Sequence, residues 1–155
     1  MEWNERIKEM EGDCQMKSYI LDASVAIKWF SEYDEDDLDK ALQLRFQILN
    51  KECEIIVPDL IFYELSNALR YNTRLTESDV KAAVQSLIDM EFDVKVVESR
   101  TAEHAIEIAY AYNVSVYDSY YLALAHLENK PLVTADYKFA ERIKKFKYLV
   151  RLSQL

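Results

Sequence analysis

Residues 18–25 read SYILDASV, a short apolar run that ends at an aspartate and continues into residues typical of a helix. Comparable runs recur at 54–57, 94–97, 132–134 and 148–152, and helical patterns lie between them at 24–30, 36–50, 59–71, 76–90, 100–112, 117–128 and 137–146. Strands that alternate with helices favour a parallel sheet covered on both faces. The sequence therefore predicts an α/β fold, a three-layer α/β/α sandwich around a central, mainly parallel sheet.

Four acidic residues stand among the apolar residues of these segments. They are Asp22 in LDAS, Glu64 in YELSNAL, Asp118 in YDSYYLALA and Asp136 in TADYKFA. A carboxylate is seldom buried without a partner, and four of them suggest one shared partner, a divalent cation. Two of the four follow predicted strands, and ligands of such sheets bind beyond the carboxyl ends of the strands. The other two are expected to project from helices toward the same edge.

Each acid also has a simpler interpretation. Asp22 and Asp136 could cap the helices that follow them. Asp118 could be a first-turn acid favoured by the helix dipole, and Glu64 could be an exposed helix residue. The shared site is preferred because one hypothesis then accounts for all four positions.

Composition limits the class of protein. The chain has 155 residues, 50% of them hydrophobic, which is enough for one globular domain with a real core. Its two cysteines show no metal-site spacing, and its single glycine, Gly12, leaves no glycine-rich nucleotide loop. The net charge of −9 argues against broad electrostatic binding of nucleic acid. No apolar run is long enough to span a membrane, so a cytoplasmic protein is expected.

The chain is expected to divide near Met16. Residues 1–15 are predicted to be an N-terminal extension, with a short helix at 2–11 that places Trp3, Ile7 and Met10 on one face. Residues 16–155 are predicted to form the main domain. Within it, Thr76 and Asp79 have the spacing of a capping box at the start of a helix.

The four acidic segments resemble the PIN-domain nucleases, in particular the VapC-like toxin ribonucleases, and the resemblance runs from about residue 17 to residue 152. The resemblance implies that the family's acidic quartet corresponds to Asp22, Glu64, Asp118 and Asp136 of this chain. It implies that the family's supporting hydroxyls correspond to Ser24 and Thr134. It also implies Mg²⁺ or Mn²⁺ at the quartet, hydrolysis of RNA, an antitoxin protein as partner, and a homodimer. Hard cations prefer carboxylate oxygens, which agrees with these residue types.

Other functions remain as alternatives. A non-catalytic PIN module that binds RNA or protein would not need the four acids together. A haloacid-dehalogenase-like phosphatase needs a second Asp two residues after the first, where this chain has Ser24. A receiver domain would need adjacent acids near the first strand. The metal-dependent endoribonuclease is the preferred hypothesis.

Several further side chains are considered for contact with a nucleic acid or for catalysis. The tyrosines at 110, 112, 117, 120 and 121 could stack on bases, although packing is the simpler account. His104 and His126 fall within helical patterns and are not assigned to catalysis. Candidates for contact with phosphate are Lys28, Arg70, Arg74, Lys138 and Arg142.

Overall fold

The central sheet has five parallel strands. A computed structural model describes residues 16–31 and 36–155 of the chain. In this part the strands are β1 (Lys17–Leu21), β2 (Cys53–Pro58), β3 (Asp93–Lys95), β4 (Leu132–Thr134) and β5 (Leu149–Arg151). Their order across the sheet is β3-β2-β1-β4-β5, and every neighbouring pair is parallel. The predicted fold class is confirmed.

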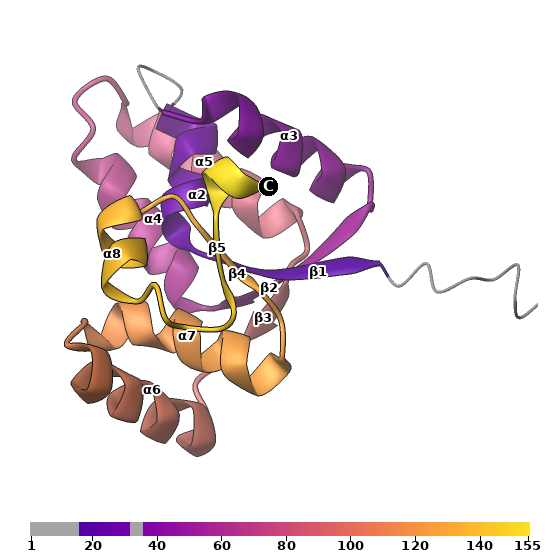
Figure 1. Ribbon diagram of the computed structural model, residues 1–155. Helices are drawn as coiled ribbons and strands as arrows, with labels where there is room; N and C mark the ends of the chain where they lie inside the picture. The colour runs from indigo at the N-terminus through magenta and orange to yellow at the C-terminus, as the bar shows by residue number, and fades with distance from the viewer. Residues whose placement is uncertain (1–15, 32–35) are drawn as a thin grey trace, which may run out of the picture.

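Helices cover both faces of this sheet (Figure 1). They are α2 (Ala23–Ser31), α3 (Leu38–Leu49), α4 (Leu60–Arg70), α5 (Glu77–Asp89), α6 (Ser99–Tyr112), α7 (Val116–Glu128) and α8 (Tyr137–Arg142), with a short 3-10 helix η1 (Leu152–Gln154). Figure 1 shows α6 and α7 side by side below the sheet, and α2 and α3 above it. The helices and the sheet thus form the three predicted layers.

The core lies between the sheet and the two helical layers. Ile20 and Leu21 of β1 and Val133 of β4 are fully buried, as is Tyr121 of α7. Burying each large apolar side chain contributes roughly 1.5–3 kcal/mol. Trp29 is buried as well, and its Nε1 donates a hydrogen bond of 2.7 Å to the carbonyl oxygen of Ala41, which links α2 to α3. The core therefore holds β1, which leads to the first acid, in a fixed position.

Two elements end two or more residues before their predicted C-terminal ends, and the other C-terminal ends agree to within one residue. β3 ends at Lys95, although the pattern predicted a strand to residue 97. Its neighbour β2 ends at Pro58, which pairs with Lys95, so Val96 and Val97 have no strand to pair with and are 65% and 63% exposed. α8 ends at Arg142 rather than at residue 146. The turns after Ile143 bring Leu149 beside Leu132, where β5 joins the sheet.

Local signals fixed other boundaries well. Thr76 caps α5: its side chain accepts a hydrogen bond from the backbone N–H of Asp79, and the Asp79 carboxylate accepts one in return from the Thr76 backbone N–H.

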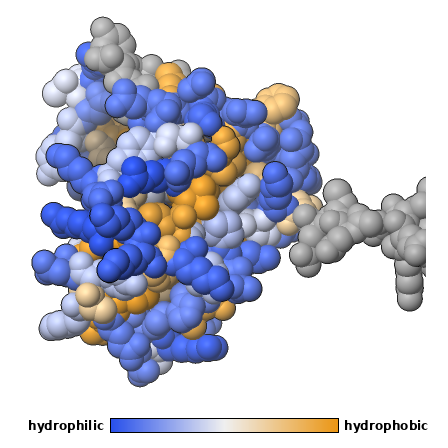
Figure 2. Space-filling view, viewed as in Figure 1, coloured by the Kyte–Doolittle hydropathy of each residue, from blue (hydrophilic) through white to orange (hydrophobic). Residues whose placement is uncertain are grey.

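No helix in the described ranges is long and apolar enough to cross a membrane. The surface seen in Figure 2 is mostly hydrophilic, with apolar side chains gathered near its centre, over β4 and β5. The helix expected at 2–11 lies outside the described residues.

Candidate active site

The topology brings two of the acids together at one edge of the sheet. Asp22 directly follows β1, and Asp136 lies two residues beyond the end of β4. These strands are neighbours, and the backbone N–H of Asp22 donates to the carbonyl oxygen of Val133 at 3.0 Å. Because both strands run in the same direction, their carboxyl ends place both residues at the same edge. Glu64 approaches this edge from α4 and Asp118 from α7.

Asp22 is the most enclosed of the four. It is 7% exposed, and its Oδ2 accepts hydrogen bonds from Ser24 Oγ at 2.5 Å and from Thr134 Oγ1 at 2.9 Å. The same hydroxyl oxygens accept from the backbone: Ser24 Oγ from the N–H of Ala135 at 2.9 Å, and Thr134 Oγ1 from the N–H of Asp136 at 3.1 Å. The two hydroxyls expected to support the acids thus connect the end of β1 to the segment after β4.

Burial also changes the acidity of Asp22. The pKa of Asp22 is raised from 3.8 to about 6, chiefly by loss of water around the carboxyl group, with a smaller contribution from the negative charges of Asp118 and Asp136. The hydrogen bonds from Ser24 and Thr134 oppose this rise because they favour the charged form. Asp22 therefore lies within electrostatic reach of two other members of the predicted quartet.

Glu64 occupies a half-buried position on α4. Burial raises its pKa from 4.5 to about 7, and the charges of Asp22 and Asp118 add to the rise. Tyr121 Oη donates a hydrogen bond of 2.8 Å to Glu64 Oε1, which lowers this pKa in part. The interpretation of Glu64 as an exposed helix residue is therefore wrong.

Tyr121 is a site residue whose role the sequence did not reveal. It is fully buried, so it cannot stack on a base from solvent, and its hydroxyl reaches across from α7 to α4. One signal was present in the sequence. Tyr121 stands three residues after Asp118, and residues with this spacing share one face of a helix.

Asp118 lies in the first turn of α7, where Ser115 caps the helix by accepting from the Asp118 N–H at 3.0 Å. Burial raises the pKa of Asp118, and the charge of Asp136 adds to the rise. The Ser115 hydroxyl and the positive charge of Arg142 act in the opposite direction. Arg142, at the end of α8, is thus a cation among the phosphate candidates that acts on a member of the quartet. Lys28, another of these candidates, is buried.

Asp136 both caps a helix and acts electrostatically on two other acids of the quartet. It is exposed at the N-terminus of α8, and its Oδ1 accepts from the backbone N–H of Phe139 at 3.0 Å, so it caps that helix as the simpler interpretation held. Its charge nevertheless acts on Asp22 and Asp118. The Asp22 carboxylate, in contrast, accepts hydrogen bonds from two hydroxyl groups, those of Ser24 and Thr134.

The four carboxylates suit a hard cation that keeps several of its water ligands better than a cation that is bound by protein side chains alone. Within residues 16–31 and 36–155, no three side chains of His, Cys, Asp or Glu lie close enough together to hold a metal ion by themselves. Mg²⁺, however, keeps several of its waters and binds proteins through one or two carboxylates. The available donors are carboxylate oxygens. Burial is the main cause that raises the pKa values of Asp22 and Glu64, and the neighbouring negative charges add to it, so a bound cation would favour the ionised forms.

Comparison with known proteins places the fold. The family model of the PIN domain matches residues 19–145. The crystal structure of PAE2754 from Pyrobaculum aerophilum is similar, with 25% identity, a TM-score of 0.59, and coverage of 90% of this chain and 93% of that one. No curated protein matches the chain.

Two further solved structures share the fold at lower identity. A toxin–antitoxin complex from Klebsiella pneumoniae is 14% identical with a TM-score of 0.65, and covers 88% of this chain and 99% of its own. VapC20 of Mycobacterium tuberculosis, a toxin that cleaves the sarcin–ricin loop, is 16% identical with a TM-score of 0.62, over 79% and 94%. Because the family model spans most of the chain, this protein belongs to the PIN domain family.

Proposed function

We propose that this protein is a metal-dependent endoribonuclease that hydrolyses RNA phosphodiester bonds at the carboxylate edge. The observation that carries the proposal is the convergence of Asp22, Glu64, Asp118 and Asp136, from two strand ends and two helices, so that their charges act on one another. An inert domain gains nothing from such mutual repulsion, which costs stability unless a cation relieves it. Membership of the PIN domain family supports the same function.

The residues divide into three roles in this proposal. Asp22 and Asp118 would be the principal ligands of Mg²⁺ or Mn²⁺, while Glu64 and Asp136 complete the site or hold its waters. When bound, the cation makes a coordinated water easier to deprotonate and stabilises charge on the scissile phosphate. Ser24 and Thr134 hold the Asp22 carboxylate in orientation through the hydrogen bonds at Oδ2. Arg142 is positioned to attract the RNA backbone near Asp118.

Cleavage of a mixed RNA pool tests the proposal. The wild type would be assayed with Mn²⁺, with Mg²⁺ and with EDTA, beside Asp118→Asn and a surface control, Glu103→Gln on the exposed side of α6. Cutting that needs metal, is lost in Asp118→Asn and survives in Glu103→Gln is the expected result. Equal cutting by all three proteins would indicate a contaminant. A wild type that binds RNA without cutting any of it would favour the alternative, a non-catalytic module.

We further propose that the enzyme is the toxin of a toxin–antitoxin pair and acts in the cytoplasm. The fold shared with a toxin–antitoxin complex and with the toxin VapC20 supports this. Induced expression of the wild type in a bacterial host is then expected to stop growth, and expression of Asp118→Asn to the same level is not. Equal growth of both cultures would count against a toxin.

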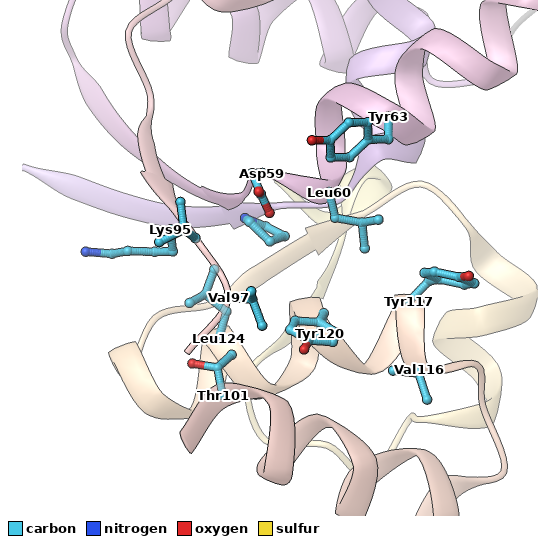
Figure 3. A pocket seen from close by; sticks show the side chains of 12 residues that line it. Asp59, Leu60, Tyr63, Lys95, Val97, Thr101, Val116, Tyr117, Tyr120 and Leu124 are labelled. Carbon is cyan, nitrogen blue, oxygen red and sulfur yellow. The ribbon is translucent and has the colours of Figure 1, made fainter. Parts of the chain in front are cut away.

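We also propose that the protein forms a homodimer through an apolar groove beside the carboxylate edge. The groove, of about 190 Å³, lies between the start of α4, the end of β3 and α7 (Figure 3). Tyr63 and Tyr117 line it, 69% and 65% exposed, and they directly precede Glu64 and Asp118. Figure 3 shows Leu60, Val97 and Tyr120 converging on the same space. This exposed apolar surface supports the proposal, because contiguous apolar patches are common at protein–protein interfaces.

Molar mass measured by light scattering tests the dimer. Val97→Asp in the groove is expected to give a monomer, whereas Phe46→Asp on α3, at a position with 64% exposure against 63% for Val97, is expected to leave the dimer intact. A dimer that survives Val97→Asp would show that another surface joins the two copies.

Residues 1–15 are proposed to be an extension outside the nuclease domain of residues 16–155, so their deletion is expected to leave RNA cleavage unchanged.

A further inference from the structure

The two histidines of the chain meet on the surface, between α6 and α7. His104 Nε2 lies 2.5 Å from His126 Nδ1, and the two ring centroids are 4.7 Å apart. These are the only histidines in the sequence. The His126 residue is exposed and the His104 side chain is 23% exposed, so both rings are within reach of a solute ion. Neither ring belongs to the carboxylate edge described above.

A carboxylate orients one of the two rings. Glu107 Oε2 lies 3.3 Å from His104 Nδ1, three residues along α6. When His104 donates its Nδ1 proton to Glu107, the Nε2 atom carries a lone pair directed at His126. A carboxylate on the far ring nitrogen is the arrangement that proteins use to orient histidines that bind metals.

The distance between the facing nitrogens suits a cation after a small adjustment. Bonds from Zn²⁺ to imidazole nitrogen are about 2.0–2.1 Å, which sets two tetrahedral nitrogens roughly 3.3 Å apart. The present 2.5 Å is shorter than that, and also shorter than an ordinary hydrogen bond. A rotation of the exposed His126 ring would open the pair by the missing distance, about 0.8 Å.

We propose that His104 and His126 form a second cation site, for a transition metal of the Zn²⁺ class, which joins α6 to α7. Imidazole nitrogen suits Zn²⁺, Cu²⁺ and Ni²⁺, whereas carboxylate oxygen suits Mg²⁺ and Mn²⁺. The two sites would thus bind different ions. Among the described residues, no group of three or more His, Cys, Asp or Glu side chains could hold a metal ion, so the two histidines would be the protein ligands and water would fill the remaining positions. The bound ion would hold α6 against the helix that carries Asp118.

Proton NMR on protein without a polyhistidine tag, at pH 7.5, tests this site directly. The two histidines give two imidazole Hε1 signals, and both are expected to shift with one equivalent of Zn²⁺ and to stay in place with millimolar Mg²⁺. In His126→Gln, the remaining His104 signal is expected to need at least ten times more Zn²⁺. Glu107→Gln is expected to weaken binding by roughly tenfold, because His104 loses its orienting partner.

Two results would overturn the proposal. One is that neither wild-type signal responds to a tenfold excess of Zn²⁺, which would leave the pair as a plain hydrogen bond. The other is that the Zn²⁺ response disappears in Asp118→Asn, which would place the ion at the carboxylates. RNA cleavage by the wild type is independent of both outcomes, so failure here does not count against the nuclease.

Discussion

Replacing Asp22 with asparagine is expected to stabilise the metal-free protein at neutral pH while it removes the proposed activity. The Asp22 carboxyl is 7% exposed, and its pKa is raised from 3.8 to about 6. Each unit of pKa shift corresponds to about 1.36 kcal/mol, so holding this group ionised costs the folded state roughly 3 kcal/mol. Asparagine keeps an oxygen that can accept from Ser24 and Thr134, and it carries no charge.

The sign of the pH dependence follows from the direction of the shift. The folded state binds the Asp22 proton more tightly than the unfolded state, so the free energy of unfolding falls as pH rises from 3.8 to about 6. Above that range the loss is complete. The advantage of Asp22→Asn is therefore expected to be small near pH 4, to grow through pH 6 and to stay constant at pH 7–8.

Urea unfolding in EDTA at pH 4, 6 and 8 measures this difference, with Glu103→Gln as the surface control. At pH 8 the midpoint of thermal unfolding of Asp22→Asn should rise by up to roughly 10 °C for a chain of this size. Mn²⁺ at a hundred times its dissociation constant should restore about 2.7 kcal/mol to the wild type and nothing to the variant. The reasoning would be refuted if Asp22→Asn were no more stable than the wild type at pH 8. It would also be refuted if the difference in free energy of unfolding between the two proteins were the same at every pH.

Three further perturbations probe the surroundings of the site. Tyr121→Phe removes the hydrogen bond to Glu64, so the pKa of Glu64 should rise above its present value of about 7 by roughly one unit; a carboxyl NMR titration measures it, and no rise would contradict the contact. Leu65→Ala leaves a cavity at a fully buried position on α4 and should lower the free energy of unfolding, measured in urea, by roughly 2–5 kcal/mol. A loss below about 1 kcal/mol would show that the surrounding side chains close the cavity. Thr76→Ala deletes the cap of α5 and should cost about 1 kcal/mol, which a change within error would disprove.

The sequence predicted those features that depend on local pattern and on strand direction. An apolar run followed by an acid placed Asp22 at the end of β1, and a parallel sheet then required Asp136 to lie at the same edge. The capping box at Thr76 was visible because it needs two residues at a fixed spacing. The pairing of Ser24 and Thr134 with Asp22 followed the family resemblance and has a geometry that fits it.

Features that depend on a distant partner were beyond such patterns. The end of β3 is set by Pro58 of the neighbouring strand, and the valines after Lys95 look like strand residues in isolation. The hydrogen bond from Tyr121 to Glu64 joins residues 57 positions apart, so the tyrosine looked like ordinary core. The contact between His104 and His126 arises only when α6 packs on α7.

Binding of Mn²⁺, followed by the loss of its free-ion signal in electron paramagnetic resonance, tests the central claim most directly. The claim is that the acids converge on one cation, so the wild type should bind Mn²⁺ saturably and Asp118→Asn at least ten times more weakly. The exposed control Glu103→Gln should match the wild type. If the wild type binds no Mn²⁺ at millimolar concentration, or if all three proteins bind it equally, the carboxylate edge is not a metal site and the account is wrong.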